Sequence, residues 1–213
     1  MVWNLYVYYI RIKPKKLCGD ILDNMNEKQV ILGITGTNGA GKGTIVEYLV
    51  NNKSFRHFSA TGLITEEIVK RNMTVNRDSM IVVGNDLRAK YGAGYIAGEL
   101  IKRAEENKGN SIIESIRTLG EVEKLKEKGG ILLAVDADQK VRYERNKKRG
   151  GEKDGVSFEE FIKQEKGEME SDDPNKQNLL ACRKVADYLV ENNGTVEELN
   201  KKIEEMLEII INK

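Results

Sequence analysis

The segment from Gly36 to Thr44 is the feature that most constrains how this chain can fold. It reads GTNGAGKGT, follows the apolar run 30–35 and precedes the amphipathic stretch 45–50. A strand, a glycine-rich turn and a helix in this order are the context of a phosphate-binding loop. Glycines let successive backbone N–H groups point into one concavity, and the following helix adds the partial positive charge of its N-terminus. The sequence therefore predicts a site for a nucleoside triphosphate.

The spacing within this segment fits the Walker A pattern with one departure. Gly36 is followed by four residues and then by Gly41 and Lys42, but the next position is Gly43 and the hydroxyl comes one residue later, at Thr44. Lys42 supplies a full charge for the β- and γ-phosphates. The residues expected to bind the nucleotide are Gly36, Asn38, Gly39, Ala40, Gly41, Lys42, Gly43 and Thr44. The lysine and the preceding strand argue against a glycine-rich turn that merely precedes a helix.

The size and charge of the chain fit a single α/β domain. Its 213 residues can bury a substantial core, and its charged residues nearly cancel to a net charge of +1, which does not indicate a general role in binding polyanions. Cys18 and Cys182 lie far apart and match no metal-binding spacing, so we expect a reduced, cytoplasmic setting. The single histidine, His57, is interpreted as a structural residue near a strand.

The first 24 residues differ in composition from the rest and are treated as an N-terminal extension of unknown role, before one domain over residues 25–213. Val2–Ile10 is apolar and aromatic, and Arg11–Lys16 is basic. The apolar run is too short to span a bilayer and lacks a preceding basic region, so we expect neither a membrane helix nor a secretory signal. An extra strand, a docking arm and sequence upstream of a start at Met25 all remain open.

Short apolar runs alternate with helical patterns, which predicts an α/β fold with a five-stranded parallel sheet flanked by helices. The strands are expected at about 30–35, 55–59, 111–115, 131–136 and 187–191. Asp78 is expected to cap a helix, and Thr118–Glu121 has the form of a capping box that opens another helix. A mostly helical insert is expected at about 60–110 and a lid at about 149–174. A helix that starts near Asp138 carries Arg142, Arg145 and Arg149 on one face, just before a glycine-rich break. The alternative for this arginine stripe is a solvated helix face.

From Val30 onward the chain resembles the nucleoside monophosphate kinases, the adenylate kinase-like branch of P-loop proteins. Gly36–Thr44 looks like the signature of that branch, Ser59–Ile64 is similar to its acceptor segment, and Ile112–Thr118 is similar to its third-strand motif. Asn85–Gly92 resembles a segment of an archaeal adenylate kinase-like family and of some phage deoxynucleotide kinases. Val185–Thr195 is similar to the last strand and adenine-side loop of that archaeal family and of dephospho-CoA kinases.

This resemblance implies an ATP-dependent kinase that uses Mg²⁺. It assigns Thr44 and Glu114, the latter through water, to the metal. It assigns catalytic roles to Lys42, Arg117, Arg145 and Arg149, acceptor binding to Thr61, Gly62, Arg88 and Arg117, and adenine-side contacts to Asn193 and Gly194. The sequence departs from the family where Glu114 replaces an aspartate and where Thr65 replaces an arginine, a charge that Arg71, Arg77 or Arg88 could supply.

The class of acceptor is inferred from the lack of an acidic residue at the end of the second expected strand. A hydroxyl acceptor benefits from a carboxylate base, whereas a phosphate acceptor is already anionic. The end of the second strand, His57–Thr61, contains no acid, which favours a nucleoside or deoxynucleoside monophosphate. Dephospho-CoA remains an alternative acceptor, with Glu114, Glu66 or Glu67 as the base. A regulatory or nucleic-acid-linked P-loop ATPase is the second alternative, although nucleotides are the expected partners. The acceptor base, the donor preference and a monomeric or dimeric state remain open.

Overall fold

The computed structural model describes residues 29–150 and 156–211. The interpretations of residues 1–24, of Cys18 and of the segment 151–155 within the expected lid lie outside the described residues.

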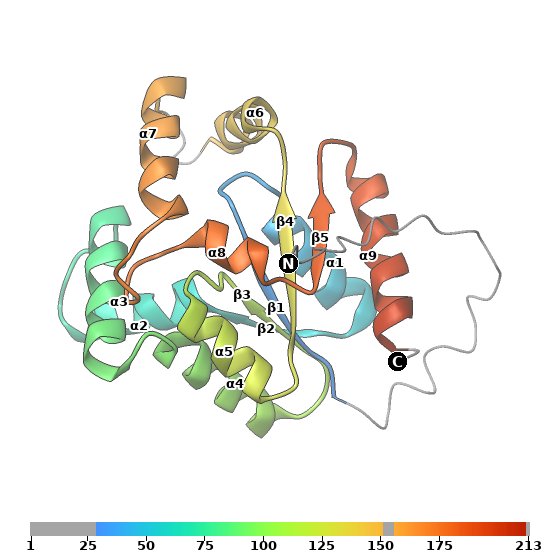
Figure 1. Ribbon diagram of the computed structural model, residues 1–213, viewed down its shortest axis with the longest axis horizontal. Helices are drawn as coiled ribbons and strands as arrows, with labels where there is room; N and C mark the ends of the chain where they lie inside the picture. The colour runs from blue at the N-terminus through green and yellow to red at the C-terminus, as the bar shows by residue number, and fades with distance from the viewer. Residues whose placement is uncertain (1–28, 151–155, 212–213) are drawn as a thin grey trace, which may run out of the picture.

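The fold is built on a parallel sheet of five strands in the order β2-β3-β1-β4-β5 (Figure 1). The strands are β1 (Ile31–Gly36), β2 (Arg56–Ser59), β3 (Ser111–Glu114), β4 (Ile131–Asp136) and β5 (Tyr188–Glu191). All five expected strands are present within about one residue of the predicted positions, and every pairing is parallel. The prediction of a five-stranded parallel α/β fold is therefore confirmed.

Helices cover both faces of the sheet. One face is covered by α1 (Lys42–Lys53) and α9 (Val196–Ile211), and the other by α2 (Ala60–Lys70), α3 (Arg77–Tyr91), α4 (Tyr95–Asn107), α5 (Leu119–Glu127) and α8 (Leu179–Lys184). The strands are apolar on both sides because each alternate residue enters a different core. In β4, Leu132 packs with α2–α5, whereas Leu133 and Val135 pack with α1 and α9.

Two further helices lie beyond the carboxyl ends of the strands. They are α6 (Gln139–Arg149) and α7 (Phe158–Met169), which stand above the sheet edge in Figure 1. Ligands of open α/β sheets bind at this edge, so both helices are positioned to cover a site there.

Local capping chemistry sets where the helices of the site begin. Thr118 and Glu121 form the capping box that the sequence predicts for α5. The sequence also suggests Asp78 as the cap of α3, but Asn76 is the N-cap: its side chain accepts from the Ser79 amide at 2.9 Å. Asp78 lies in the first turn, where its charge complements the helix dipole.

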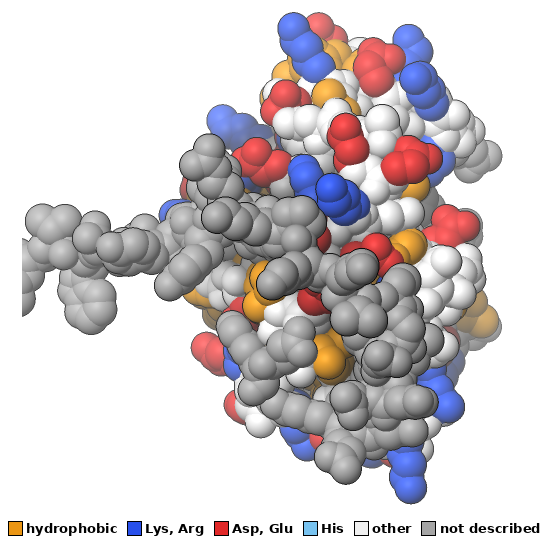
Figure 2. Space-filling model, turned by 90° about the vertical axis from the view of Figure 1, so that its right-hand side faces the viewer, with side chains coloured by type: hydrophobic (Ala, Val, Ile, Leu, Met, Phe, Trp, Pro, Cys, Tyr) orange, Lys and Arg blue, Asp and Glu red, His pale blue; other side chains and the backbone are white. Residues whose placement is uncertain are grey.

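The outer surface carries mixed charge. On the face shown in Figure 2, lysine and arginine side chains are interspersed with aspartate and glutamate wherever described residues are visible. No helix in the described part of the chain is long and apolar enough to cross a membrane.

Candidate nucleotide-binding site

The phosphate loop, residues 36–44, connects the end of β1 to the start of α1. Gly36 and Gly39 have φ angles of 147° and 79°, and a Cβ at these positions would lie 2.1 Å from the Val135 carbonyl oxygen and 2.5 Å from that of Arg142. A side chain is therefore excluded at both positions by conformation and by space. A Cβ at Gly43 would meet nothing within 4 Å, so this departure from the common pattern leaves open space beside Lys42.

Lys42 lies at the N-terminus of α1 and points back over the loop. Its ammonium group donates to the carbonyl oxygens of Gly36 at 2.7 Å and Thr37 at 2.8 Å. Burial, followed by the charges of Arg117 and Arg149, lowers the pKa of Lys42 to about 7, although Glu114 and Glu168 act in the opposite direction. The charges of two arginines and two carboxylates therefore act on the loop lysine, and burial is the largest cause of its lowered pKa.

Glu114 lies at the end of β3 and is paired with His57 on β2, their Oε2 and Nε2 atoms 2.9 Å apart. The hydrogen bond with His57 lowers the pKa of Glu114, and the charges of His57, Lys42 and Arg117 act in the same direction against the effect of burial. Our interpretation of His57 as a structural residue therefore misses its contact with a candidate metal residue. The signal was the placement of both residues near the carboxyl ends of neighbouring parallel strands.

Two of the four expected acceptor residues, Thr61 and Gly62, lie in the first turn of α2 and are exposed. Arg117 follows β3 and is half-buried, with its guanidinium bonded to Glu168 at 3.1 Å and to Gln177. The resemblance assigns it to the acceptor, and the structure holds it within electrostatic reach of Lys42.

Arg88 has a different position from the one expected. Its side chain is 3% exposed and its Nε donates to Glu121 at 2.9 Å, so its charge is neutralised inside the protein. Glu121 also accepts from the backbone amide of Arg117 at 2.7 Å. Arg88 therefore supports the segment that carries Arg117, and the expectation that it contacts the acceptor directly is corrected on this point.

The expected arginine stripe of α6 does not form one surface. Arg142 is buried and donates to the Ala137 carbonyl at 2.7 Å and to Glu165 on α7, which is incompatible with a solvated helix face. Arg145 donates to the carbonyl oxygens of Asn192 at 2.7 Å and Gly194 at 3.1 Å, away from a lid role. Arg149 is exposed at the end of α6, and its charge acts on Lys42.

The loop after β5 lies against the phosphate loop. The Asn192 side chain donates to the Ala40 carbonyl at 2.8 Å, and the Asn193 side chain accepts from the Asp138 amide at 2.7 Å. Asn193 and Gly194, the expected adenine-side residues, are exposed beside this contact. Asn192 is not among the expected site residues, although it directly follows the last strand and lies within the segment Val185–Thr195.

Asp136 is a second residue that sequence reasoning missed. It ends β4 and accepts from the Thr37 hydroxyl at 2.8 Å, while its other oxygen is paired with Arg183 of α8. The signal was an acid directly after a buried strand, at the sheet edge where ligands bind. Asp136 therefore fixes one side of the phosphate loop.

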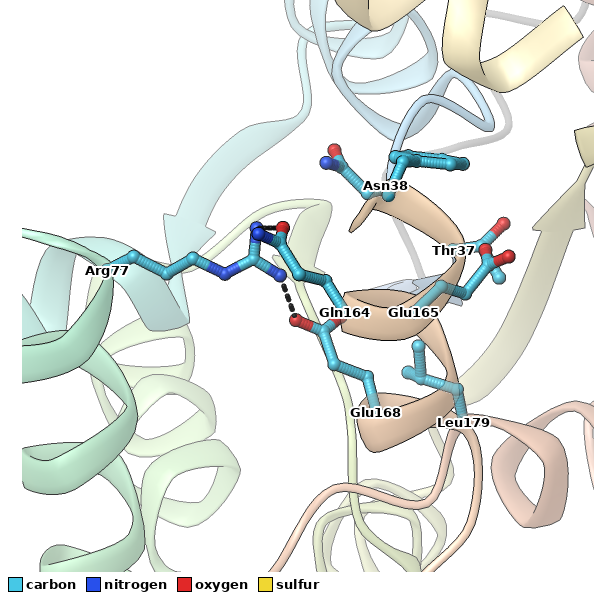
Figure 3. Close-up of a pocket in the computed structure, with 8 residues that line it drawn as sticks. Thr37, Asn38, Arg77, Gln164, Glu165, Glu168 and Leu179 are labelled. Carbon is cyan, nitrogen blue, oxygen red and sulfur yellow. Dashed lines mark hydrogen bonds and ion pairs between the residues drawn. The ribbon is translucent and has the colours of Figure 1, made fainter. Parts of the chain in front are cut away.

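A small hollow lies between the phosphate loop, α7 and α3. In Figure 3, Arg77 extends from α3 towards Gln164 and Glu168 of α7, and its guanidinium bonds them at 2.6 Å and 2.9 Å. The hollow is lined by Thr37, Asn38, Arg77, Phe161, Gln164, Glu165, Glu168 and Leu179. Its lining therefore combines residues of the phosphate loop, α3, α7 and α8.

The donor set fits a magnesium–nucleotide complex better than a metal held by protein alone. Within residues 29–150 and 156–211, no group of three or more His, Cys, Asp or Glu side chains is arranged to hold a metal ion. Mg²⁺ commonly keeps several waters and takes one or two carboxylates plus substrate phosphates. Thr44, on the loop, and Glu114, whose charge acts on Lys42, are the residues that would hold it.

Comparison with known proteins agrees with this geometry. A family model described as an AAA domain matches residues 32–173, more than half of the chain. A UPF0200 protein of Staphylothermus marinus is 28% identical over 187 residues, which cover 87% of this chain and 95% of the relative. A UPF0200 protein of Sulfurisphaera tokodaii is 29% identical over 182 residues, which cover 85% and 97%.

Solved structures extend the comparison to the fold. The shikimate kinase of Acinetobacter baumannii, solved in complex with shikimate, has a TM-score of 0.54 and 19% identity, covering 88% of this chain and 96% of the kinase. A sugar kinase of a Janibacter species has a TM-score of 0.52 and 17% identity, covering 85% and 96%. At these identities the likeness shows the fold alone, which is that of the P-loop kinases.

Proposed function

The chain belongs to the P-loop family that the AAA-domain model describes, and from this membership we propose that it transfers the γ-phosphoryl group of ATP to a nucleoside or deoxynucleoside monophosphate. The observation that carries the proposal is that two cationic side chains, Lys42 and Arg117, lie at the same edge of the sheet. The phosphate loop with Lys42 follows β1, and Arg117 follows β3, which pairs with β1 in parallel, so both residues lie at this edge. The charge of Arg117 also contributes to the lowered pKa of Lys42. Lys42 can therefore bind the triphosphate of the donor, and Arg117 can bind the phosphate of the acceptor.

On the donor side, the backbone amides of the phosphate loop and Lys42 bind the triphosphate. The Lys42 ammonium then exchanges the carbonyl oxygens of Gly36 and Thr37 for phosphate oxygens. Arg145 holds the carbonyls of the loop after β5, so we assign Arg145 to the donor-nucleotide side, beside Asn193 and Gly194. When bound, Mg²⁺ supplies charge neutralisation at the β- and γ-phosphates, near Thr44 and Glu114.

On the acceptor side, Arg117 binds the phosphate of the monophosphate, because a guanidinium matches two phosphate oxygens at once. An oxygen of that phosphate attacks the γ-phosphorus as the bond to the β,γ-bridging oxygen breaks, and ADP leaves. Arg149 lies at the end of α6, before the segment 151–155. We propose that it stabilises the negative charge of the transferring phosphoryl group. We assign Thr61 and Gly62, which are exposed in the first turn of α2, to the acceptor side as well.

The pair formed by His57 and Glu114 bears on the alternative of a hydroxyl acceptor such as dephospho-CoA. Glu114 is one of two glutamates whose charge acts on Lys42, and it ends the strand β3 next to β2. The lowered pKa of Glu114 makes it a weaker base than an ordinary glutamate, and base strength governs how well it takes a proton from a hydroxyl group. This observation supports a phosphate acceptor.

A screen of ADP release tests the proposal. ATP and Mg²⁺ are combined with each nucleoside monophosphate, each deoxynucleoside monophosphate and dephospho-CoA, and ATPase activity is measured with and without nucleic acid. We expect ADP release that depends on one or a few monophosphates. Release that depends on dephospho-CoA alone, or on nucleic acid alone, would replace the proposal with one of the two alternatives.

Arg117→Lys separates the acceptor side from the donor side. A lysine keeps the charge but cannot make the two-point contact, so we expect the KM for the acceptor to rise by about tenfold or more. ATP affinity, measured by titration, should remain close to that of the wild type. An unchanged acceptor KM in a folded Arg117→Lys protein would remove Arg117 from the acceptor site.

A further inference from the structure

Glu168 on the lid helix α7 holds two arginines that come from different parts of the fold. Its Oε1 accepts from Arg77 of α3 at 2.9 Å, and its Oε2 accepts from Arg117, after β3, at 3.1 Å. The carboxylate thus has one guanidinium on each oxygen. Arg77 belongs to the helical insert and Arg117 to the sheet edge, and Glu168 is the carboxylate that bridges them.

Both guanidinium groups are positioned by neutral partners as well. Arg77 also donates to Gln164 at 2.6 Å, and Arg117 also donates to Gln177. The Glu168 side chain is 17% exposed, and its charge acts on Lys42. Arg77 and Arg117, called here the arginine clamp, therefore form a preorganised site for an anion within electrostatic reach of the donor lysine.

We propose that the arginine clamp binds the acceptor phosphate and that Glu168 fills this site in the free protein, so that the acceptor and the lid helix compete for the same two arginines. This inference rests on the proposed function, because it identifies the acceptor by its phosphate. It adds Arg77 to the acceptor site and gives Glu168 the role of an internal competitor.

The competition has a direction that follows from charge. A phosphate monoester near neutral pH carries more negative charge than one carboxylate and offers three oxygens instead of two. The acceptor can therefore displace Glu168, although its apparent affinity is lowered by the fraction of molecules in which the clamp is already occupied. Glu165 remains as a second tie of α7, through its ion pair with Arg142. Loss of the Glu168 contact thus releases one turn of the lid helix without detaching α7 from α6.

The test uses Glu168→Gln, which keeps the size of the side chain but removes its charge. The phosphate loop is first saturated with Mg²⁺ and β,γ-imido-ATP, and inorganic phosphate is then titrated by calorimetry. We expect the Kd for phosphate to fall by about tenfold in Glu168→Gln, because the clamp is then free in most molecules. The matched control is Glu170→Gln, which removes an exposed carboxylate two residues further on and should leave the Kd unchanged.

A second substitution locates the bound phosphate. Arg77→Lys in the Glu168→Gln background should return the Kd towards the wild-type value, since a lysine makes one contact where arginine makes two. A Kd in folded Glu168→Gln that equals or exceeds the wild-type value would overturn the inference, as would a tight Kd that Arg77→Lys does not change.

If Glu168→Gln does not fold, hydrogen exchange in the wild type gives the same answer. Phosphate binding should accelerate amide exchange in the last turn of α7, and unchanged or slower exchange would overturn the inference.

The proposed function and the proposed competition by Glu168 fail in different ways. Turnover with monophosphates but no change in Kd in Glu168→Gln removes the competition and leaves the function, whereas a tighter Kd without turnover for any monophosphate removes the function and leaves an anion site.

Discussion

Lys42 has two groups of neighbours that act on its charge in opposite directions. Burial, with Arg117 and Arg149, favours the neutral amine, and Glu114 and Glu168 favour the ammonium form, with a resulting pKa of about 7. A bound triphosphate adds several negative charges next to this amine and raises its pKa. In our account, nucleotide binding and protonation of Lys42 are therefore coupled.

The first prediction at this scale is that ATP binding takes up a proton above neutral pH. At about pH 8 most free protein carries a neutral Lys42, so binding of Mg·ATP should take up about one proton, and affinity should fall as the pH rises further. Calorimetry in buffers of different ionisation enthalpy measures this uptake. The control is Lys42→Arg, whose side chain stays charged and should show none.

The same pKa fixes the sign of the effect on folding. Between about pH 7 and the ordinary lysine value of 10.5, the unfolded chain binds more protons at Lys42 than the folded protein does. The contribution of Lys42 to the free energy of unfolding of the nucleotide-free protein therefore rises with pH across this window.

For the calorimetric experiment, absence of proton uptake on ATP binding at about pH 8 would mean that Lys42 is already charged before ATP binds.

At the scale of elements, one buried ion pair joins the helical insert to the sheet edge. Arg88 of α3 and Glu121 of α5 are 3% and 1% exposed, and Glu121 also accepts from the amide of Arg117. Removing one partner of a buried pair leaves an uncompensated charge inside the protein. The pair therefore joins α3 to the first turn of α5 and supports the position of Arg117.

We predict that Glu121→Gln lowers the free energy of unfolding by roughly 3–5 kcal/mol. Urea unfolding measures the loss. Glu123→Gln, which changes an exposed carboxylate on the same helix, should alter the free energy by less than about 0.5 kcal/mol. Because the two partners are coupled, Arg88→Met combined with Glu121→Gln should recover much of the loss. Equal effects of Glu121→Gln and Glu123→Gln would show that the pair contributes little.

The elements that the sequence predicts well are those determined by local patterns. The five strands follow from apolar runs, the phosphate loop from its glycines, and the start of α5 from the capping box of Thr118 and Glu121. The polar pairs of the site are different, because their partners are far apart in the chain and many residues of each type compete. Glu121 lies 33 residues from Arg88, and Glu168 lies 91 from Arg77. The spacing of charges along one helix cannot identify such partners. For this reason the spacing of Arg142, Arg145 and Arg149 predicts one shared surface, although Arg142 and Arg145 have different partners.

At the scale of the whole molecule, the donor and acceptor sides come from separate parts of the chain. In our proposal, the phosphate loop and the loop after β5 form the donor side, and α2, α3 and the segment after β3 form the acceptor side. Helices α6 and α7 lie over both at the carboxyl edge of the sheet (Figure 1). If the proposed function is correct, two nucleotides meet beneath α6 and α7, and these helices limit the access of water and so suppress hydrolysis of ATP.

The central claim is that the γ-phosphoryl group moves from ATP to an acceptor phosphate, and following that group tests the claim most directly. The protein is incubated with Mg²⁺, ATP that carries radioactive phosphorus at the γ position, and the monophosphate that most increases ADP release. Our account predicts that the label enters the nucleoside diphosphate, and that Lys42→Met lowers this transfer by on the order of 10²- to 10³-fold while remaining folded. Label that appears only as inorganic phosphate, or wild-type transfer by folded Lys42→Met, would contradict the account.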